Sequence, residues 1–108
     1  MSRVSAGTKE VTIGGHDYTL KVTISAIEQI ERKYGDFHSA ARKCMSLGWG
    51  DAVFILSKAA GLDKARTEQM KEHAIVEGLE SLATMAAEYL GMVINPEGAK
   101  EGDESGEV

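Results

Sequence analysis

Residues 11–24 read VTIGGHDYTLKVTI, and this segment decides the fold because two alternating apolar and polar runs flank a pair of glycines. Successive side chains of a strand point to opposite faces, so the apolar residues from Tyr18 to Ile24 share one face. Adjacent glycines supply the positive φ angles that tight hairpin turns require. The segment therefore predicts a β-hairpin that turns at Gly14 and Gly15.

A two-residue turn also fixes the strand register, which pairs Ile13 with His16 and Val11 with Tyr18. In this register all the apolar side chains of both strands lie on one face. A two-stranded hairpin is only marginally stable in water, so its apolar face needs a cover. We expect Ile27, Ile30 and the last helix of the chain to provide it.

The rest of the chain shows helical periodicity interrupted by glycines. Ser25 and Glu28 form a capping box at the start of a first helix, and Asp51 can cap the third. The expected helices cover about residues 25–35, 37–48, 52–60, 67–77 and 79–94. The fold class is therefore predicted as α+β, with an N-terminal β-hairpin followed by a bundle of about five short helices.

The length of 108 residues corresponds to one domain. We expect a flexible arm at residues 1–8, a single α+β domain at 9–94 and a disordered acidic tail at 95–108. Residues 96–108 contain five acidic side chains and one lysine, and no aromatic residue. This composition is typical of a solvated terminus, and an acidic docking tail is the other interpretation.

Composition also narrows the class of protein. The formal net charge of −5 argues against nucleic-acid binding, because such proteins usually carry a basic face. No apolar run approaches the roughly 20 residues of a membrane span, and the N-terminus lacks the apolar core of a signal peptide. One cysteine allows no intrachain disulfide, which fits a reducing compartment. We therefore expect a cytoplasmic protein.

The sequence contains no recognisable catalytic or cofactor-binding motif. The three histidines are not spaced as metal ligands, and Cys44 is the lone cysteine. A cysteine nucleophile paired with a distant histidine is a weak alternative, because a single Cys on an Ala-rich face is more often a small buried apolar residue. We predict no catalytic residue, no metal and no cofactor, and hence no enzyme.

Four residues are candidates for contact with another protein: Trp49, Tyr18, Met45 and Met70. Methionine packs irregular cores and also lines adaptable binding grooves. Trp49 lies between two glycines, where it could fold back onto the domain or anchor a partner. Both interpretations stay open for these side chains.

Several short motifs occur in a fixed order along the chain. The hairpin contains a G-x-x-Y-x-L pattern at 15–20, and IEQIE follows at 27–31. Later come DAV at 51–53, AAGL at 59–62 and a helix pair interrupted at Gly78. Over residues 10–93 this order resembles the tail assembly chaperone-like family of phages and gene transfer agents.

The resemblance implies a small factor in the cytoplasm of a bacterial host. It would bind the tape measure protein and the tail tube protein during assembly, without catalytic residues. A structural tail component of a prophage or gene transfer agent is the alternative, and a small regulatory binding protein is less favoured. The free hairpin edges also lead us to expect a homo-oligomer. A strict monomer in analytical ultracentrifugation would contradict self-association.

Overall fold

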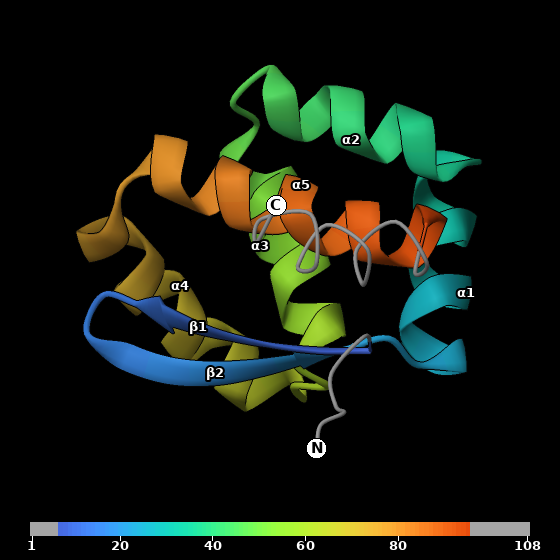
Figure 1. Ribbon diagram of the computed structural model, residues 1–108. Coiled ribbons are helices and arrows are strands. Elements are labelled where there is room, and N and C mark those ends of the chain that lie inside the picture. The colour runs from blue at the N-terminus through green and yellow to red at the C-terminus, as the bar shows by residue number, and fades with distance from the viewer. Residues whose placement is uncertain (1–6, 96–108) are drawn as a thin grey trace, which may run out of the picture.

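A computed structural model describes residues 7–95 of the chain. The elements are β1 (Thr8–Ile13), β2 (His16–Lys21), α1 (Ile24–Tyr34), α2 (Phe37–Met45), α3 (Trp49–Ala59), α4 (Lys64–Glu77) and α5 (Leu79–Ile94) (Figure 1). A hairpin followed by five helices confirms the predicted α+β class. The predicted arm and tail fall outside the described residues, apart from residues 7, 8 and 95.

The hairpin has the predicted register. β1 and β2 are antiparallel, and Ile13 pairs with His16 while Val11 pairs with Tyr18. Gly14 and Gly15 form the turn with φ angles of 59° and 86°, a region that residues with a Cβ atom rarely enter. The side chains of Val11, Ile13 and Leu20 are buried, so the apolar face of the hairpin points into the core.

The cover of this face agrees with the prediction for the last helix, α5, and differs from it for the other helices. Helices α3, α4 and α5 pack against the hairpin, whereas α1 packs mainly on α2 and α3. The strand ends at Lys21, and Ile24 is already the first residue of α1, where it is 76% exposed. The expected alternation is therefore wrong at Ile24, because the backbone there is helical.

A hydrogen bond and an ion pair join α5 to the hairpin. The hydroxyl of buried Tyr89 donates a hydrogen bond to the carbonyl oxygen of Lys21 over 2.7 Å. Lys9 on β1 forms an ion pair with Glu88 over 3.3 Å. Tyr89 thus fixes the end of β2 from within the core.

Helices α1 and α4 each begin directly after a residue whose side chain caps the helix, and these capping residues differ in part from those predicted. Thr23 caps α1 by accepting from the backbone N–H of Ala26, so the capping box at Ser25 is wrong. Asp63 caps α4, which moves its start to Lys64 from the expected residue 67. Asp and Thr serve well as caps because their side-chain oxygens satisfy N–H groups that lack a partner inside the helix.

The start of α3 also differs. It begins at Trp49, three residues before the predicted position, and Gly48 is its N-cap. Asp51 lies in the first turn and accepts a hydrogen bond of 2.6 Å from the hydroxyl of Tyr34 on α1. A carboxylate in this turn also meets the partial positive charge of the helix N-terminus.

The core lies between the hairpin and the helices, with α3 and α5 packed together and α2 against α5 (Figure 1). Its largest completely buried apolar side chains come from every element: Ile13, Leu20, Ile30, Cys44, Ile55, Leu56, Met70, Leu82, Tyr89 and Leu90. Within residues 7–95, the helices are all too short or too polar to cross a bilayer.

Candidate protein-binding site

The four predicted contact residues occupy different environments. Met45, at the end of α2, is 69% exposed. Trp49 is half-buried and packs against the core, which agrees with the interpretation that it folds back. Tyr18 is half-buried, and its hydroxyl lies 2.7 Å from Nδ1 of His73. The structure does not bring these side chains together into one site.

Met70 requires a correction. Its side chain is completely buried in the core, on the inner face of α4. A partner could not touch it without unfolding the domain. Of the two roles that methionine commonly has, this residue fills a gap between helices. Met45 is thus the candidate that remains on the surface as an exposed apolar side chain.

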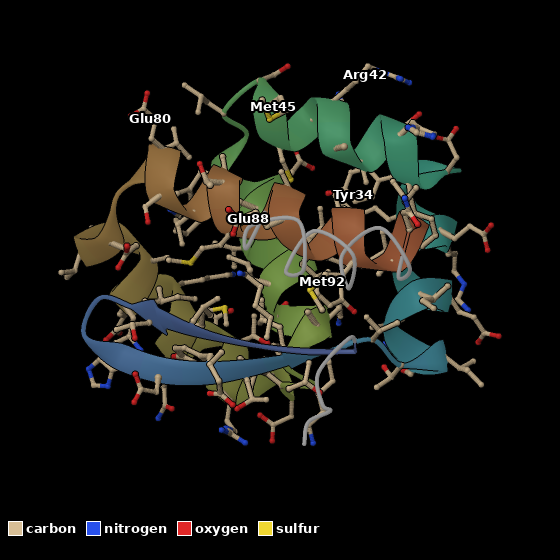
Figure 2. All side chains as sticks on the ribbon, viewed as in Figure 1. Tyr34, Arg42, Met45, Glu80, Glu88 and Met92 are labelled. Atoms are coloured by element: carbon tan, nitrogen blue, oxygen red, sulfur yellow. The ribbon has the colours of Figure 1, made fainter. Side chains whose placement is uncertain are left out.

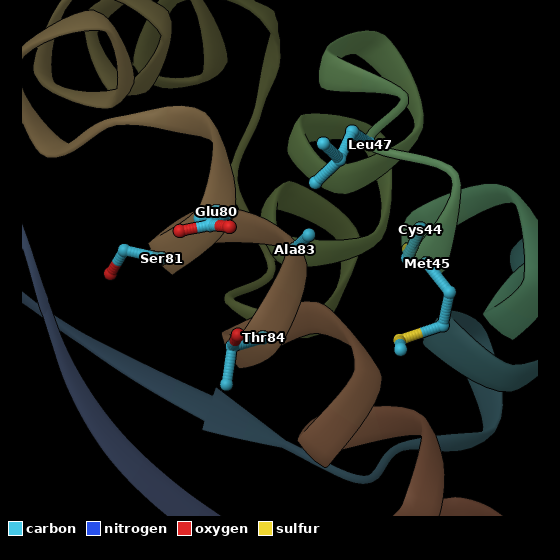
Figure 3. Close-up of a pocket in the computed structure, with 7 residues that line it drawn as sticks. All are labelled: Cys44, Met45, Leu47, Glu80, Ser81, Ala83 and Thr84. Atoms are coloured by element: carbon cyan, nitrogen blue, oxygen red, sulfur yellow. The ribbon is translucent and has the colours of Figure 1, made fainter.

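Met45 borders an open groove of about 570 Å³. One wall comes from the end of α2 and the loop after it, and the other comes from the first half of α5 (Figure 3). Figure 2 places Met45 where α2 passes α5, with Glu80 at the start of α5. The lining residues are Cys44, Met45, Leu47, Glu80, Ser81, Ala83 and Thr84.

The two walls differ in chemistry. Met45 and Leu47 present exposed apolar surface, whereas Glu80 and Thr84 present exposed polar side chains. Cys44 is completely buried beneath them, and burial raises the pKa of its thiol to about 11, with a smaller contribution from Asp51. A thiol with so high a pKa is protonated at neutral pH and is a poor nucleophile. The groove is suited to contact rather than to thiol chemistry.

Leu47 has an unusual backbone conformation. Its φ angle is 62°, and it is the only residue other than glycine with a positive φ among residues 7–95. The N–H groups of Leu47 and Gly48 donate to the carbonyls of Cys44 and Lys43, which is the Schellman pattern that ends α2. Leu47 therefore occupies the position that glycine normally takes, and it presents a 45% exposed side chain there.

Replacing Leu47 by Gly should raise the free energy of unfolding by about 0.5–1 kcal/mol. A side chain in the left-handed region costs about 1–2 kcal/mol, and the greater freedom of glycine in the unfolded chain offsets part of that gain. Urea denaturation measures the change, with Leu47→Ala as the control that keeps the strain. A loss of more than about 1 kcal/mol in the glycine variant would show instead that Leu47 packs productively.

Met45 was predicted from the sequence as a contact residue, whereas the other residues of the groove were not. One feature of the sequence could have identified Leu47. The glycine after α2 is Gly48, which lies one position beyond the residue that must adopt a positive φ angle at the helix end. No feature of the sequence identified Ser81 and Thr84, since polar residues on a helix ordinarily face solvent. Their place in the groove depends on how α5 packs against α2.

The described part of the chain holds no cluster of three or more His, Cys, Asp or Glu side chains that could bind a metal ion. Comparisons of the chain with protein-family models, with curated proteins and with solved structures find no match.

Proposed function

We propose that this chain is a phage-like tail assembly chaperone that binds the tape measure protein, the tail tube protein or both during tail morphogenesis. Two independent lines of support meet in this proposal. The first is the ordered set of sequence motifs between residues 10 and 93. The second is the groove between α2 and α5, with exposed apolar side chains on one wall.

The observation that supports the proposal most strongly is the exposed side chain of Leu47 on a backbone with a positive φ angle. An exposed apolar side chain held in a left-handed backbone conformation lowers the stability of the isolated domain. Such strain tends to occur where a protein contacts a ligand or partner. Burying Leu47 and Met45 under a partner would contribute about 1–2 kcal/mol each, given how much of each side chain is exposed.

The chemistry of the groove indicates what a partner segment should look like. An amphipathic helix could place apolar side chains on Met45 and Leu47 and polar ones beside Glu80 and Thr84. A long helical protein such as a tape measure would present such segments repeatedly. Methionine adapts to different side chains, so Met45 suits a groove that accepts related segments rather than one sequence.

Self-association remains part of the proposal. In the described chain β1 and β2 pair only with each other, so each strand has an outer edge that could pair with a second copy. Repeated subunits are a property of structural tail components as well. The alternative function as a subunit retained in the finished tail therefore rests on this feature.

Affinity capture tests the proposal directly. The tagged chain is co-expressed with the tape measure protein encoded in the same gene cluster and, separately, with the tail tube protein. We expect at least one of them to be retained through washing at 0.5 M salt, on the order needed to screen surface charges. Retention of neither would contradict the proposal.

Purified particles distinguish the chaperone from the structural alternative. A chaperone leaves the assembly and should be missing from finished tails, whereas a tube component should be abundant in them. Quantitative mass spectrometry of particles gives this answer. The genes on either side of this one offer a second check, because tail tube and tape measure genes are expected there.

A further inference from the structure

Helix α3 is largely enclosed by the other elements and reaches the surface along one stripe. Between residues 51 and 59, Asp51, Phe54 and Lys58 are half-buried, and the other residues are buried. Residues three and four apart lie on one face of a helix, so these three side chains form a continuous strip. The strip runs beside the end of α1, where the ring of Tyr34 meets that of Phe54 edge-on at 6.1 Å between centroids.

Two lysine side chains converge on the ring of Phe54. Nζ of Lys33, on α1, lies 4.8 Å from the ring centroid, and Nζ of Lys58, on α3, lies 5.4 Å from it. Cation–π attraction holds an ammonium group over an aromatic ring at such distances. Because both distances share one centroid, the two ammonium groups are within roughly 10 Å of each other. Lys33, Phe54 and Lys58 together form a cationic patch.

The charges of the cationic patch are not neutralised within residues 7–95, where neither ammonium group forms an ion pair. Asp51, on the same strip, offsets part of the positive charge, but its carboxylate accepts a hydrogen bond from Tyr34 instead. Asp36 caps α2. Glu31 is two residues from Lys33 on α1, a spacing at which helical side chains do not face each other. The patch is therefore suited to an anionic group from outside the described residues.

The C-terminal segment of the same chain carries the complementary charge. Residues 96–108 hold five acidic side chains against Lys100, a net charge of −4. The described part of α5 ends on the side of the molecule where α1 lies (Figure 1). Thirteen extended residues reach about 45 Å, which exceeds the 38 Å length of the longest axis of the molecule. The segment is thus long enough to reach the cationic patch.

We propose that the acidic segment of residues 97–107 docks on the cationic patch of its own domain. Residues three apart in an extended chain are separated by about 10 Å, so Glu101 and Glu104 can meet both ammonium groups at once. This inference does not depend on the proposed function.

The docking is weak and depends on the covalent tether. One exposed ion pair favours association by a factor of about 1.4 to 5, so two pairs raise the ratio of docked to free segment about 2- to 30-fold. The tether holds the segment at an effective concentration of the order of millimolar, which a separate acidic peptide does not have. The segment therefore occupies the patch in a fraction of the molecules and exchanges with solvent.

Paramagnetic relaxation suits a contact of this kind, because it detects partly populated states. A nitroxide is attached to a Ser105→Cys variant of the full ¹⁵N-labelled chain. Cys44 is buried and its thiol is protonated, so the reagent modifies the introduced cysteine. At about 20 mM salt the amides of Lys33, Phe54 and Lys58 should be relaxed, and this effect should fall at least about threefold at about 0.5 M salt. The hairpin tip (Gly14 and Gly15), at the other end of the molecule from α1, should not be relaxed (Figure 1).

Two double variants separate the cationic patch from charge in general. Lys33→Gln with Lys58→Gln removes both ammonium groups, and the relaxation at Phe54 should fall at least about threefold. Lys21→Gln with Lys43→Gln removes the same charge from β2 and α2. This control should keep the relaxation at Phe54 close to the wild-type value.

Two further samples test the segment itself. The combination Glu101→Gln, Asp103→Asn and Glu104→Gln removes three carboxylates beside the same nitroxide, and relaxation at the patch should again fall at least about threefold. The other sample mixes ¹⁵N-labelled chain that lacks the nitroxide with unlabelled chain that carries it. Its patch amides should not be relaxed, because each segment docks on its own domain.

Four results would overturn the proposal. One is the absence of relaxation at the patch at low salt, and another is equal relaxation in the wild type and in Lys33→Gln with Lys58→Gln. Equal relaxation with the neutral segment would mean that the nitroxide makes the contact. Relaxation in the mixture as strong as in the singly labelled chain would assign the contact to the segment of a second copy.

Discussion

Replacing Tyr89 by Ala is expected to lower the free energy of unfolding by about 3–5 kcal/mol, the usual cost of removing a large aromatic side chain from a core. Tyr89 is completely buried on α5. Its hydroxyl also satisfies the carbonyl oxygen of Lys21 at the end of β2. Burial raises the pKa of Tyr89 to about 12, so the hydroxyl remains protonated at neutral pH and able to donate.

Urea denaturation followed by circular dichroism measures this loss. Tyr89→Phe is the matched control, because it keeps the ring and removes only the hydrogen bond, at an expected cost of about 1–2 kcal/mol. A domain of this size is stable by about 5–15 kcal/mol in total, so the Ala variant should be close to unfolding. An Ala variant within about 1 kcal/mol of the wild type would show that Tyr89 is not central to the core.

Replacing Gly14 by Ala should destabilise the domain by about 3 kcal/mol. The φ angle of 59° disfavours any Cβ by about 1–2 kcal/mol. The new Cβ would also meet the backbone carbonyl of His73 at 2.3 Å, and backbone cannot rotate away as a side chain can. The tip must then lift from α4 and lose its charged hydrogen bond to Glu77.

Gly15→Ala is the control for this prediction. Gly15 has a φ angle of 86°, but a Cβ there would meet nothing within 4 Å. Its expected cost is therefore about 1–2 kcal/mol, from backbone strain alone. Thermal or urea denaturation compares the two variants. Equal losses would mean that the close approach of the tip to α4 contributes nothing to stability.

Local signals were strong enough to predict the hairpin and its register. Two glycines and an unbroken alternation leave few other arrangements, because a slip of one residue would turn every apolar side chain outward. The alternation gave the wrong prediction at Ile24, which was expected in a strand. Thr23 caps α1 and ends the extended backbone there. A capping threonine and a strand threonine cannot be distinguished in the sequence. The boundary between β2 and α1 therefore depended on how α1 packs.

Long-range arrangements could not be read from the sequence. The cover of the hairpin by α4 depends on pairs such as Gly14 with Glu77 and Tyr18 with His73, and no local pattern links them. Met70 and Met45 look equivalent on their helices, yet one is completely buried and the other exposed. Which face of a short helix points inward is decided by its neighbours as well as by its own periodicity.

The groove beside Met45 is the proposed binding site for a partner protein of tail assembly. Isothermal titration of a tape measure protein and, separately, of a tail tube protein, each taken from the gene cluster expected around this gene, into the purified chain tests it most directly. Met45→Glu places a charge on the apolar wall, and Ile24→Glu makes the same change at an exposed residue that does not line the groove. We expect the wild type and Ile24→Glu to bind equally, and Met45→Glu to bind at least about 30-fold more weakly, which is the effect of losing one hot-spot side chain. Equal binding by the wild type and both variants, or binding of neither partner to any of the three, would contradict it.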